Sequence, residues 1–124
     1  MARNPRDVTD AELEVLRTLW DLGPSPIRPL ADRLYPGGGP AHYATVQKLL
    51  ERLEAKSCVS RKRRGRQFVY RARLSRDELV SRRLRETARQ LGDGSLTPLV
   101  THLVNAGELR PEEIAALKRL VEEL

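Results

Sequence analysis

The chain has 124 residues, a length that suits one compact domain, or a small domain with a helical extension. Its residues are 40% hydrophobic and 32% charged, and no apolar run is long enough to span a membrane. Its start, MARNPRDVTD, lacks the apolar core of a signal peptide, which predicts a cytoplasmic protein, and its single cysteine excludes a disulfide framework and a multi-cysteine zinc site. The net charge of +6 is unevenly distributed. Residues 1–74 hold 15 Lys and Arg against 8 Asp and Glu, whereas residues 75–124 hold 8 Lys and Arg against 9 Asp and Glu. The first part is therefore expected to bind a nucleic acid or another anionic surface.

Two helices are predicted before residue 36. Thr9 and Glu12 form a capping-box pattern at the start of TDAELEVLRTLWDL, whose apolar residues recur at helical spacing. GPSP ends this helix, and IRPLADRLY predicts a short second one in which Pro29 is tolerable only in the first turn. PGGGP, residues 36–40, is expected to be a turn.

Residues 41–56 give the clearest helical pattern in the chain. Val46, Leu49, Leu50 and Leu53 form a narrow apolar stripe. The opposite face carries small and polar residues, among them Ala44 and Lys48.

The period then changes from helical to alternating. CVSRKR and QFVYRA predict two strands joined by a turn at residues 64–66, with Val59, Phe68 and Tyr70 as inward or cross-strand anchors. Seven of the sixteen residues from 58 to 73 are basic and none is acidic. The run is therefore either solvated surface or a hairpin that touches DNA, and its alternation favours the hairpin over a tag in a disordered tail.

The rear part predicts three more helices. Ser75 and Glu78 form a second capping box, followed by a helix to about Leu91. LTPLVTHLVNAG and RPEEIAALKRLVEEL complete the set, with prolines near their starts. About fifty residues are too few to bury three apolar stripes, so a second copy is expected to cover them. The residues expected in this dimer contact are Leu79, Leu84, Leu99, Leu103, Leu117, Leu120 and Val121.

Three helices followed by a basic hairpin is the order of a winged helix-turn-helix module. The fold class expected is mainly α with a small β-hairpin: a winged-helix DNA-binding domain over residues 1–74 and a helical dimerisation region over 75–124. The third helix would enter the major groove and the hairpin would contact the backbone. The expected DNA-contacting residues are Tyr43, Ala44, Thr45, Gln47, Lys48 and Arg52 of the helix and Arg61, Arg63, Arg64 and Arg66 of the hairpin.

AELEVLRTLW, the YATVQKLLERL segment and FVYRA resemble the corresponding parts of the BlaI/MecI/CopY family, bacterial regulators of the penicillinase-repressor type. The resemblance extends through the C-terminal helices and implies a homodimer that represses transcription from a palindromic operator. In one branch a membrane sensor triggers proteolysis, and that cut would align with His102-Leu103, where the family commonly has an Asn-Phe type of pair. The copper-responsive branch has a cysteine-rich C-terminus, which this chain lacks, so no metal or cofactor is expected.

Some residues have ordinary explanations beside the functional ones. Trp20 and Cys58 are expected in the core rather than in a ligand or redox site. His42, near the apolar side of its helix, and His102 are expected to be structural rather than metal ligands, and Tyr43 fits phosphate contact and packing equally. No catalytic arrangement is present, so an enzyme is not expected. A winged helix that binds RNA or an acidic protein is the alternative to a repressor.

Overall fold

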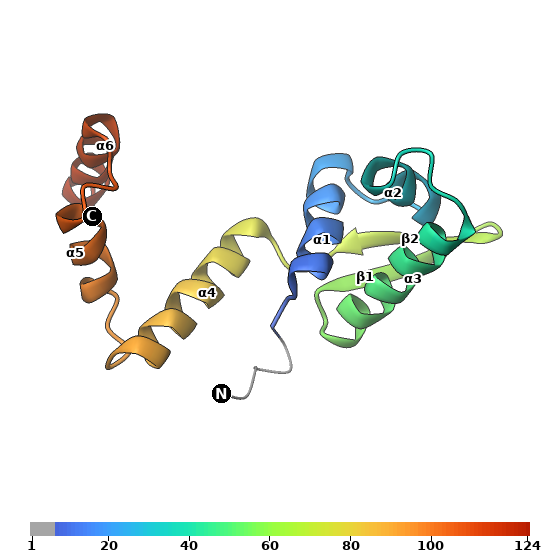
Figure 1. The fold of residues 1–124 in the computed structure, drawn as a ribbon, viewed down its shortest axis with the longest axis horizontal. Coiled ribbons are helices and arrows are strands. Elements are labelled where there is room, and N and C mark those ends of the chain that lie inside the picture. The colour runs from blue at the N-terminus through green and yellow to red at the C-terminus, as the bar shows by residue number, and fades with distance from the viewer. Residues whose placement is uncertain (1–6) are drawn as a thin grey trace. The chain divides into compact units, whose positions relative to one another are not determined.

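The structure, a computed structural model, describes residues 7–124, and the polar N-terminal arm up to residue 6 lies outside the described residues. The chain divides into two compact units, Met1–Glu78 and Leu79–Leu124. It is mainly helical, with six helices and one two-stranded hairpin within residues 7–124, as the sequence predicts (Figure 1).

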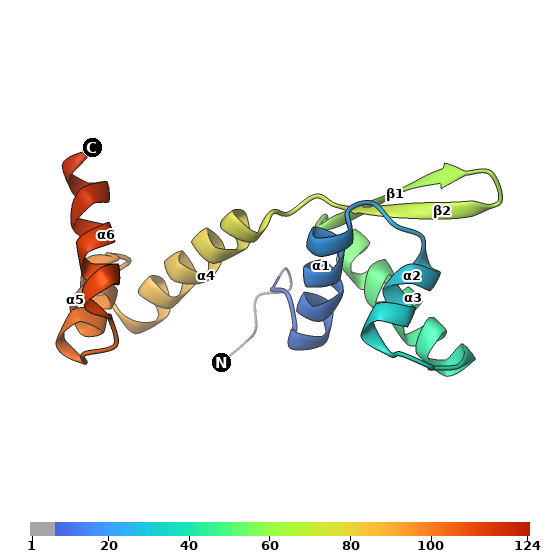
Figure 2. The same cartoon turned by 90° about the horizontal axis from the view of Figure 1, so that it is seen from above.

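The first unit contains three helices and the hairpin. The helices are α1 (Asp10–Leu22), α2 (Ile27–Leu34) and α3 (Pro40–Ala55), and the strands are β1 (Val59–Arg64) and β2 (Gln67–Ala72). The hairpin lies along one side of the three helices (Figure 2). The apolar stripes of the helices meet in one core, in which Leu16, Leu30, Leu50 and Leu53 are fully buried.

The helix boundaries follow from caps that the sequence contains. The Thr9 side chain accepts a hydrogen bond from the Glu12 backbone N–H and the Glu12 carboxylate accepts one from that of Thr9, which confirms the capping box at α1. Pro29 lies in the first turn of α2 as expected. α3 begins one residue earlier than predicted, because Pro40 occupies the first turn, where its missing N–H costs nothing.

The backbone conformation at the end of α3 directs the chain from this helix into the first strand of the hairpin. Ser57 has a φ of +61°, and the N–H groups of Ser57 and Cys58 donate to the carbonyls of Glu54 and Leu53. This is a Schellman motif in which serine stands where glycine is usual. Cys58 is fully buried, as expected, so the chain leaves α3 directly into the core before β1 begins.

Hydrogen bonds at two places fasten the base of the hairpin to the helices. Ser25, in the loop between α1 and α2, exchanges two hydrogen bonds with Tyr70 of β2, at 2.9 and 2.8 Å. The Trp20 indole N–H donates to the Leu74 carbonyl at 2.9 Å. Trp20 is half-buried rather than wholly internal, and Arg76 stacks over its ring. The base of the hairpin is therefore fixed, while its tip extends away from the core.

The second unit consists of most of α4 (Arg76–Leu91), α5 (Thr97–Asn105) and α6 (Pro111–Glu122). The capping box at the start of α4 is confirmed, since the Glu78 N–H donates to the Ser75 hydroxyl and the Ser75 N–H to the Glu78 carboxylate. Neither α5 nor α6 contains a buried residue. This unit therefore lacks a closed core of its own.

Candidate nucleic-acid interface

α3 presents a continuous exposed face to solvent. Val46, Leu49, Leu50 and Leu53 are buried, and the six residues expected to contact DNA are all exposed: Tyr43, Ala44, Thr45, Gln47, Lys48 and Arg52. The hydroxyl of Thr45 donates to the Ala41 carbonyl at 3.0 Å, and in this arrangement it can also accept a hydrogen bond from a base. The amide of Gln47, the ammonium of Lys48, the guanidinium of Arg52 and the hydroxyl of Tyr43 are donors on this face.

The hairpin ends in a two-residue turn. Arg64 pairs with Gln67, so the turn consists of Gly65 and Arg66, one residue shorter than the predicted turn at residues 64–66. Gly65 has a φ of +63° and Arg66 a negative one, the pattern of a type II′ turn, which needs glycine at its first central position. The turn therefore projects the side chains of Arg64 and Arg66 at the tip of the hairpin.

The four hairpin arginines expected at the DNA differ in their surroundings. The Nε of Arg61 lies 3.4 Å from a Glu54 carboxylate oxygen, and the Nε of Arg63 donates to the Gly65 carbonyl at 3.2 Å. Within residues 7–124, no hydrogen bond or ion pair joins the side chain of Arg64 or Arg66 to another residue. Arg64 and Arg66 are therefore the two of the four arginines whose guanidinium groups make no polar contact within residues 7–124.

Phe68 takes the second of the two roles expected for it, inward anchor or cross-strand anchor. Val59 and Tyr70 are buried, but Phe68 is 36% exposed. It lies on the same face as Tyr70 but nearer the tip. Its ring is covered instead by Arg61, whose guanidinium carbon is 4.3 Å from the ring centroid, and by Arg63 at 5.9 Å. Phe68 is thus a cross-strand contact and not an inward anchor.

A cleft of about 380 Å³ lies where α2, α3 and the hairpin meet. Tyr43 and Gln47 line it from α3, and Arg61, Arg66 and Phe68 line it from the hairpin. Its remaining basic residue is Arg28 of α2, which sequence reasoning missed. Arg28 stacks on Tyr43 at 5.5 Å, and its place at the start of the helix that precedes α3 was the available signal.

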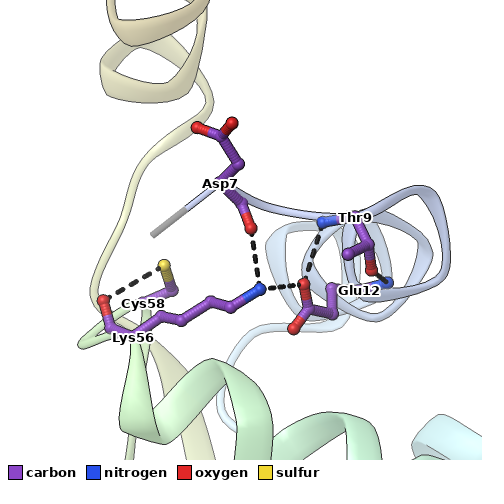
Figure 3. Close-up of polar contacts among 5 residues, drawn as sticks. All are labelled: Asp7, Thr9, Glu12, Lys56 and Cys58. Carbon is purple, nitrogen blue, oxygen red and sulfur yellow. Dashed lines mark hydrogen bonds and ion pairs between the residues drawn. The ribbon is translucent and has the colours of Figure 1, made fainter. Parts of the chain in front are cut away.

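A buried ion pair joins the first turn of α1 to the end of α3 (Figure 3). Glu12 of α1 is fully buried, and its Oε1 accepts hydrogen bonds from the Lys56 ammonium at 2.6 Å and the Thr9 N–H at 2.8 Å. Lys56 also donates to the Asp7 carbonyl at 2.7 Å. Burial raises the pKa of Glu12, but the hydrogen bonds from Lys56 and Thr9 and the charge of Lys56 outweigh it, so this pKa lies below its usual 4.5.

The histidines are not gathered into a metal site. His42 lies on the apolar side of α3, four residues before the buried Val46, but it is exposed, as are all the residues from 40 to 45. Its ring stacks on Tyr35 with centroids 4.6 Å apart. Across residues 7–124, no three His, Cys, Asp or Glu side chains come together as metal ligands would.

The second unit exposes most of its apolar side chains. Of the residues expected in a dimer contact, Leu79 is buried and Leu99 half-buried, and five are exposed: Leu84, Leu103, Leu117, Leu120 and Val121. His102 and Leu103 are both exposed in the middle of α5. In the described part of the chain, no helix combines the length and apolar character that crossing a membrane requires.

These features define the class of protein: a winged helix-turn-helix, with an exposed polar helix and a basic hairpin on one unit. The sequence profile described as penicillinase repressor matches residues 8–123. The chain therefore belongs to the penicillinase repressor family and is a DNA-binding transcriptional repressor, not an enzyme. It is also 27% identical over 121 residues, 98% of this chain and 82% of the relative, to an "Uncharacterized 16.5 kDa protein in ptsI 3'region" of Latilactobacillus sakei.

Proposed function

We propose that this repressor is a cytoplasmic homodimer that binds an inverted-repeat operator, with α3 in the major groove and the hairpin on the backbone. The observation that carries the proposal is the pairing, on one unit, of an exposed helix face rich in hydrogen-bonding groups with a basic hairpin. Gln47 and Lys48 supply donors for base edges, and the small side chain of Ala44 allows close approach to a thymine methyl. The arginines at the hairpin tip supply phosphate contacts that do not depend on sequence.

Electrophoretic mobility shift with the promoter upstream of its own gene tests this function. We expect binding that weakens steeply with salt and that prefers the promoter over a scrambled duplex of the same composition. Equal affinity for both duplexes, with tight binding to a folded RNA or to an acidic protein, would replace the proposal by the interaction-module alternative.

Dimerisation through the second unit is proposed from its exposed apolar surface. Leu120 and Val121 are 61% and 66% exposed in the single chain, and Leu91 is 79% exposed. Apolar side chains gathered in this way on three helices of a small unit indicate an interface, and a two-fold partner is the commonest solution. Such a dimer predicts operator half-sites about one helical turn apart.

Sedimentation of matched α6 variants tests the dimer. Leu120→Glu places a carboxylate on the apolar stripe, and Ala115→Glu places the same group on the opposite face of the helix, where Ala115 is exposed. We expect the first variant to shift the protein toward monomer and to weaken operator binding more than tenfold, and the second to behave as wild type. A wild-type protein that sediments as a monomer at micromolar concentration would contradict the proposal.

Relief of repression by proteolysis is proposed within α5, at His102-Leu103. Proteases act on extended chain, so a cut there needs α5 to unwind locally. α5 has nine residues and buries none of them, so its opening is expected to cost little. Protein recovered from cells in which the regulated genes have been switched on should be cut in α5. Intact protein after induction, or a cut elsewhere, argues against this route.

A further inference from the structure

Two arginine–aromatic pairs face the cleft between α2, α3 and the hairpin. Arg28 lies over the ring of Tyr43 on the helical wall, and Arg61 lies over the ring of Phe68 on the hairpin wall. We propose that this cleft binds one phosphodiester of the DNA backbone and that the guanidinium of Arg28 binds its oxygens from the helical side. The inference rests on the proposed function, since it requires α3 and the hairpin to face the duplex together.

The stacking explains why these arginines are ready to bind. A guanidinium held over an aromatic ring by a cation–π contact still has N–H groups to offer an oxygen ligand, although the Nε of Arg61 already faces Glu54. The ring also restricts the rotamers of a long side chain, so less conformational entropy is lost when the ligand arrives. Arg28 therefore presents a preorganised fork of donors, of the kind that matches two phosphate oxygens.

The charge of the cleft selects an anion. Arg28, Arg61 and Arg66 line it, and no Asp or Glu is among the described residues that do so. α2 begins at this cleft, and its N-cap residue, Pro26, provides no side-chain hydrogen bond to the first turn. The positive end of the helix dipole and an uncapped N–H therefore add to the three guanidinium groups.

The size and position of the cleft favour a DNA backbone over a free anion. A volume of about 380 Å³ exceeds what a single phosphate ion needs and leaves room for the adjoining sugar. Gln47, which belongs to the base-reading face of α3, lines the same cleft. A strand seated there would continue toward the bases that α3 reads, so Arg28 would help to set the depth of α3 in the groove.

Fluorescence anisotropy on full-length protein tests the role of Arg28, with the promoter duplex and its scrambled counterpart titrated over a series of KCl concentrations. Arg28→Ala should weaken binding to both duplexes about tenfold and lower the magnitude of the slope of log K against log[KCl] by about 0.9 per bound protomer. Arg33→Ala is the matched control: it removes an exposed arginine of the same helix that does not line the cleft. It should leave affinity and slope within experimental scatter.

Three further variants separate charge, stacking and hydroxyl chemistry. Arg28→Lys keeps the charge but loses the planar fork, so the salt slope should persist while affinity falls about threefold. Tyr43→Phe keeps the ring and should bind within about twofold of wild type, whereas Tyr43→Leu should lose about threefold at an unchanged slope. Thermal melting of each variant should match wild type, because both side chains lie at the surface.

The outcomes distinguish this inference from the proposed function. If Arg28→Ala and Arg33→Ala behave alike while wild type prefers the promoter, the cleft proposal is wrong and the repressor function stands. If wild type binds both duplexes equally, sequence-specific recognition fails, and the Arg28 comparison on either duplex still decides the cleft. Equal losses in Tyr43→Phe and Tyr43→Leu would show that the hydroxyl and not the stacked ring matters. No binding of wild type to any duplex would overturn both proposals.

Discussion

Lys56→Met is expected to destabilise the first unit severely, because it leaves a carboxylate buried without a counter-charge. Glu12 is fully buried, and Lys56 supplies the 2.6 Å contact to its Oε1. The second oxygen, Oε2, is buried without a hydrogen-bond partner in the described residues, so in Lys56→Met the Thr9 N–H would be the remaining donor to this carboxylate there, with no counter-charge. Removing one partner of a buried ion pair costs about 3–5 kcal/mol.

This cost translates into a large change in the melting temperature. For a domain of this size, 1 kcal/mol corresponds to about 4–8 °C, so Lys56→Met should melt at least ~12 °C below wild type. The only tryptophan, Trp20, lies in the first unit and hydrogen-bonds to Leu74, so its fluorescence reports the unfolding of that unit. Urea titration followed by this fluorescence gives the free energy of unfolding.

The pH dependence of stability should differ in sign between the two proteins. In wild type the pKa of Glu12 is lowered on folding, so ionised Glu12 stabilises the fold above pH 4.5 and that contribution is lost as the pH falls through the folded pKa. In Lys56→Met burial remains while the ammonium is gone, so the pKa of Glu12 should lie above its unfolded value. The stability difference between the two proteins should therefore narrow from pH 7 toward pH 4.

Two controls make this reasoning refutable. Arg17→Met breaks the exposed pair with Glu14, at 3.5 Å, and should cost less than about 0.5 kcal/mol. Combining Glu12→Gln with Lys56→Met removes both charges and should recover more than half of the loss. Equal costs for Lys56→Met and Arg17→Met, or a double variant no more stable than the single one, would show that the buried pair does not carry this energy.

Three other variants address the interface and its supports. Glu54→Gln removes the ion pair that occupies Arg61 and should tighten binding to every duplex about two- to fivefold in anisotropy; weaker binding would mean that Glu54 orients Arg61 for DNA. Ser57→Gly removes the strain of a non-glycine residue at a φ of +61°, so it should raise the urea midpoint and increase the free energy of unfolding by about 0.5–1 kcal/mol. A lower free energy of unfolding would point to a role for the serine hydroxyl. Replacing Arg63, Arg64 and Arg66 together by alanine should weaken binding to the promoter and to the scrambled duplex alike. A loss of binding confined to the promoter would refute the idea that these arginines set affinity while α3 sets specificity.

Local patterns in the sequence predicted most of the fold. The capping boxes at Thr9 and Ser75 marked two helix starts, and the change from helical to alternating spacing after residue 57 marked the hairpin, because caps and periodicity act over a few residues. The end of α3 was harder to interpret. Serine at position 57 adopts the left-handed conformation that sequence patterns associate with glycine, so the Schellman motif had no sequence signal.

Contacts between segments far apart in the chain could not be predicted from local patterns in the sequence. Alternation placed Phe68 and Tyr70 on one face of the hairpin, but only the position of the helices decides that Tyr70 is buried and Phe68 is not. The Glu12–Lys56 pair joins residues 44 positions apart, and Glu12 alone appeared to be an ordinary capping residue. Arg28 was overlooked because its partner, Tyr43, lies on another helix.

The surroundings of each arginine refine what the basic hairpin can do. The formal charge of the hairpin suggests a uniform surface for binding a polyanion. However, Arg61 already forms an ion pair with Glu54 and a cation–π contact with Phe68, and Arg63 donates a hydrogen bond to the Gly65 carbonyl in the turn. A side chain that is already oriented binds at less entropic cost but in only one geometry, whereas a freely moving one binds phosphate wherever the backbone passes. The arginines at the tip, Arg64 and Arg66, are thus suited to affinity. Under the proposed function, the two arginines paired with aromatic rings, Arg28 and Arg61, are suited to holding one phosphate at a fixed place beside α3.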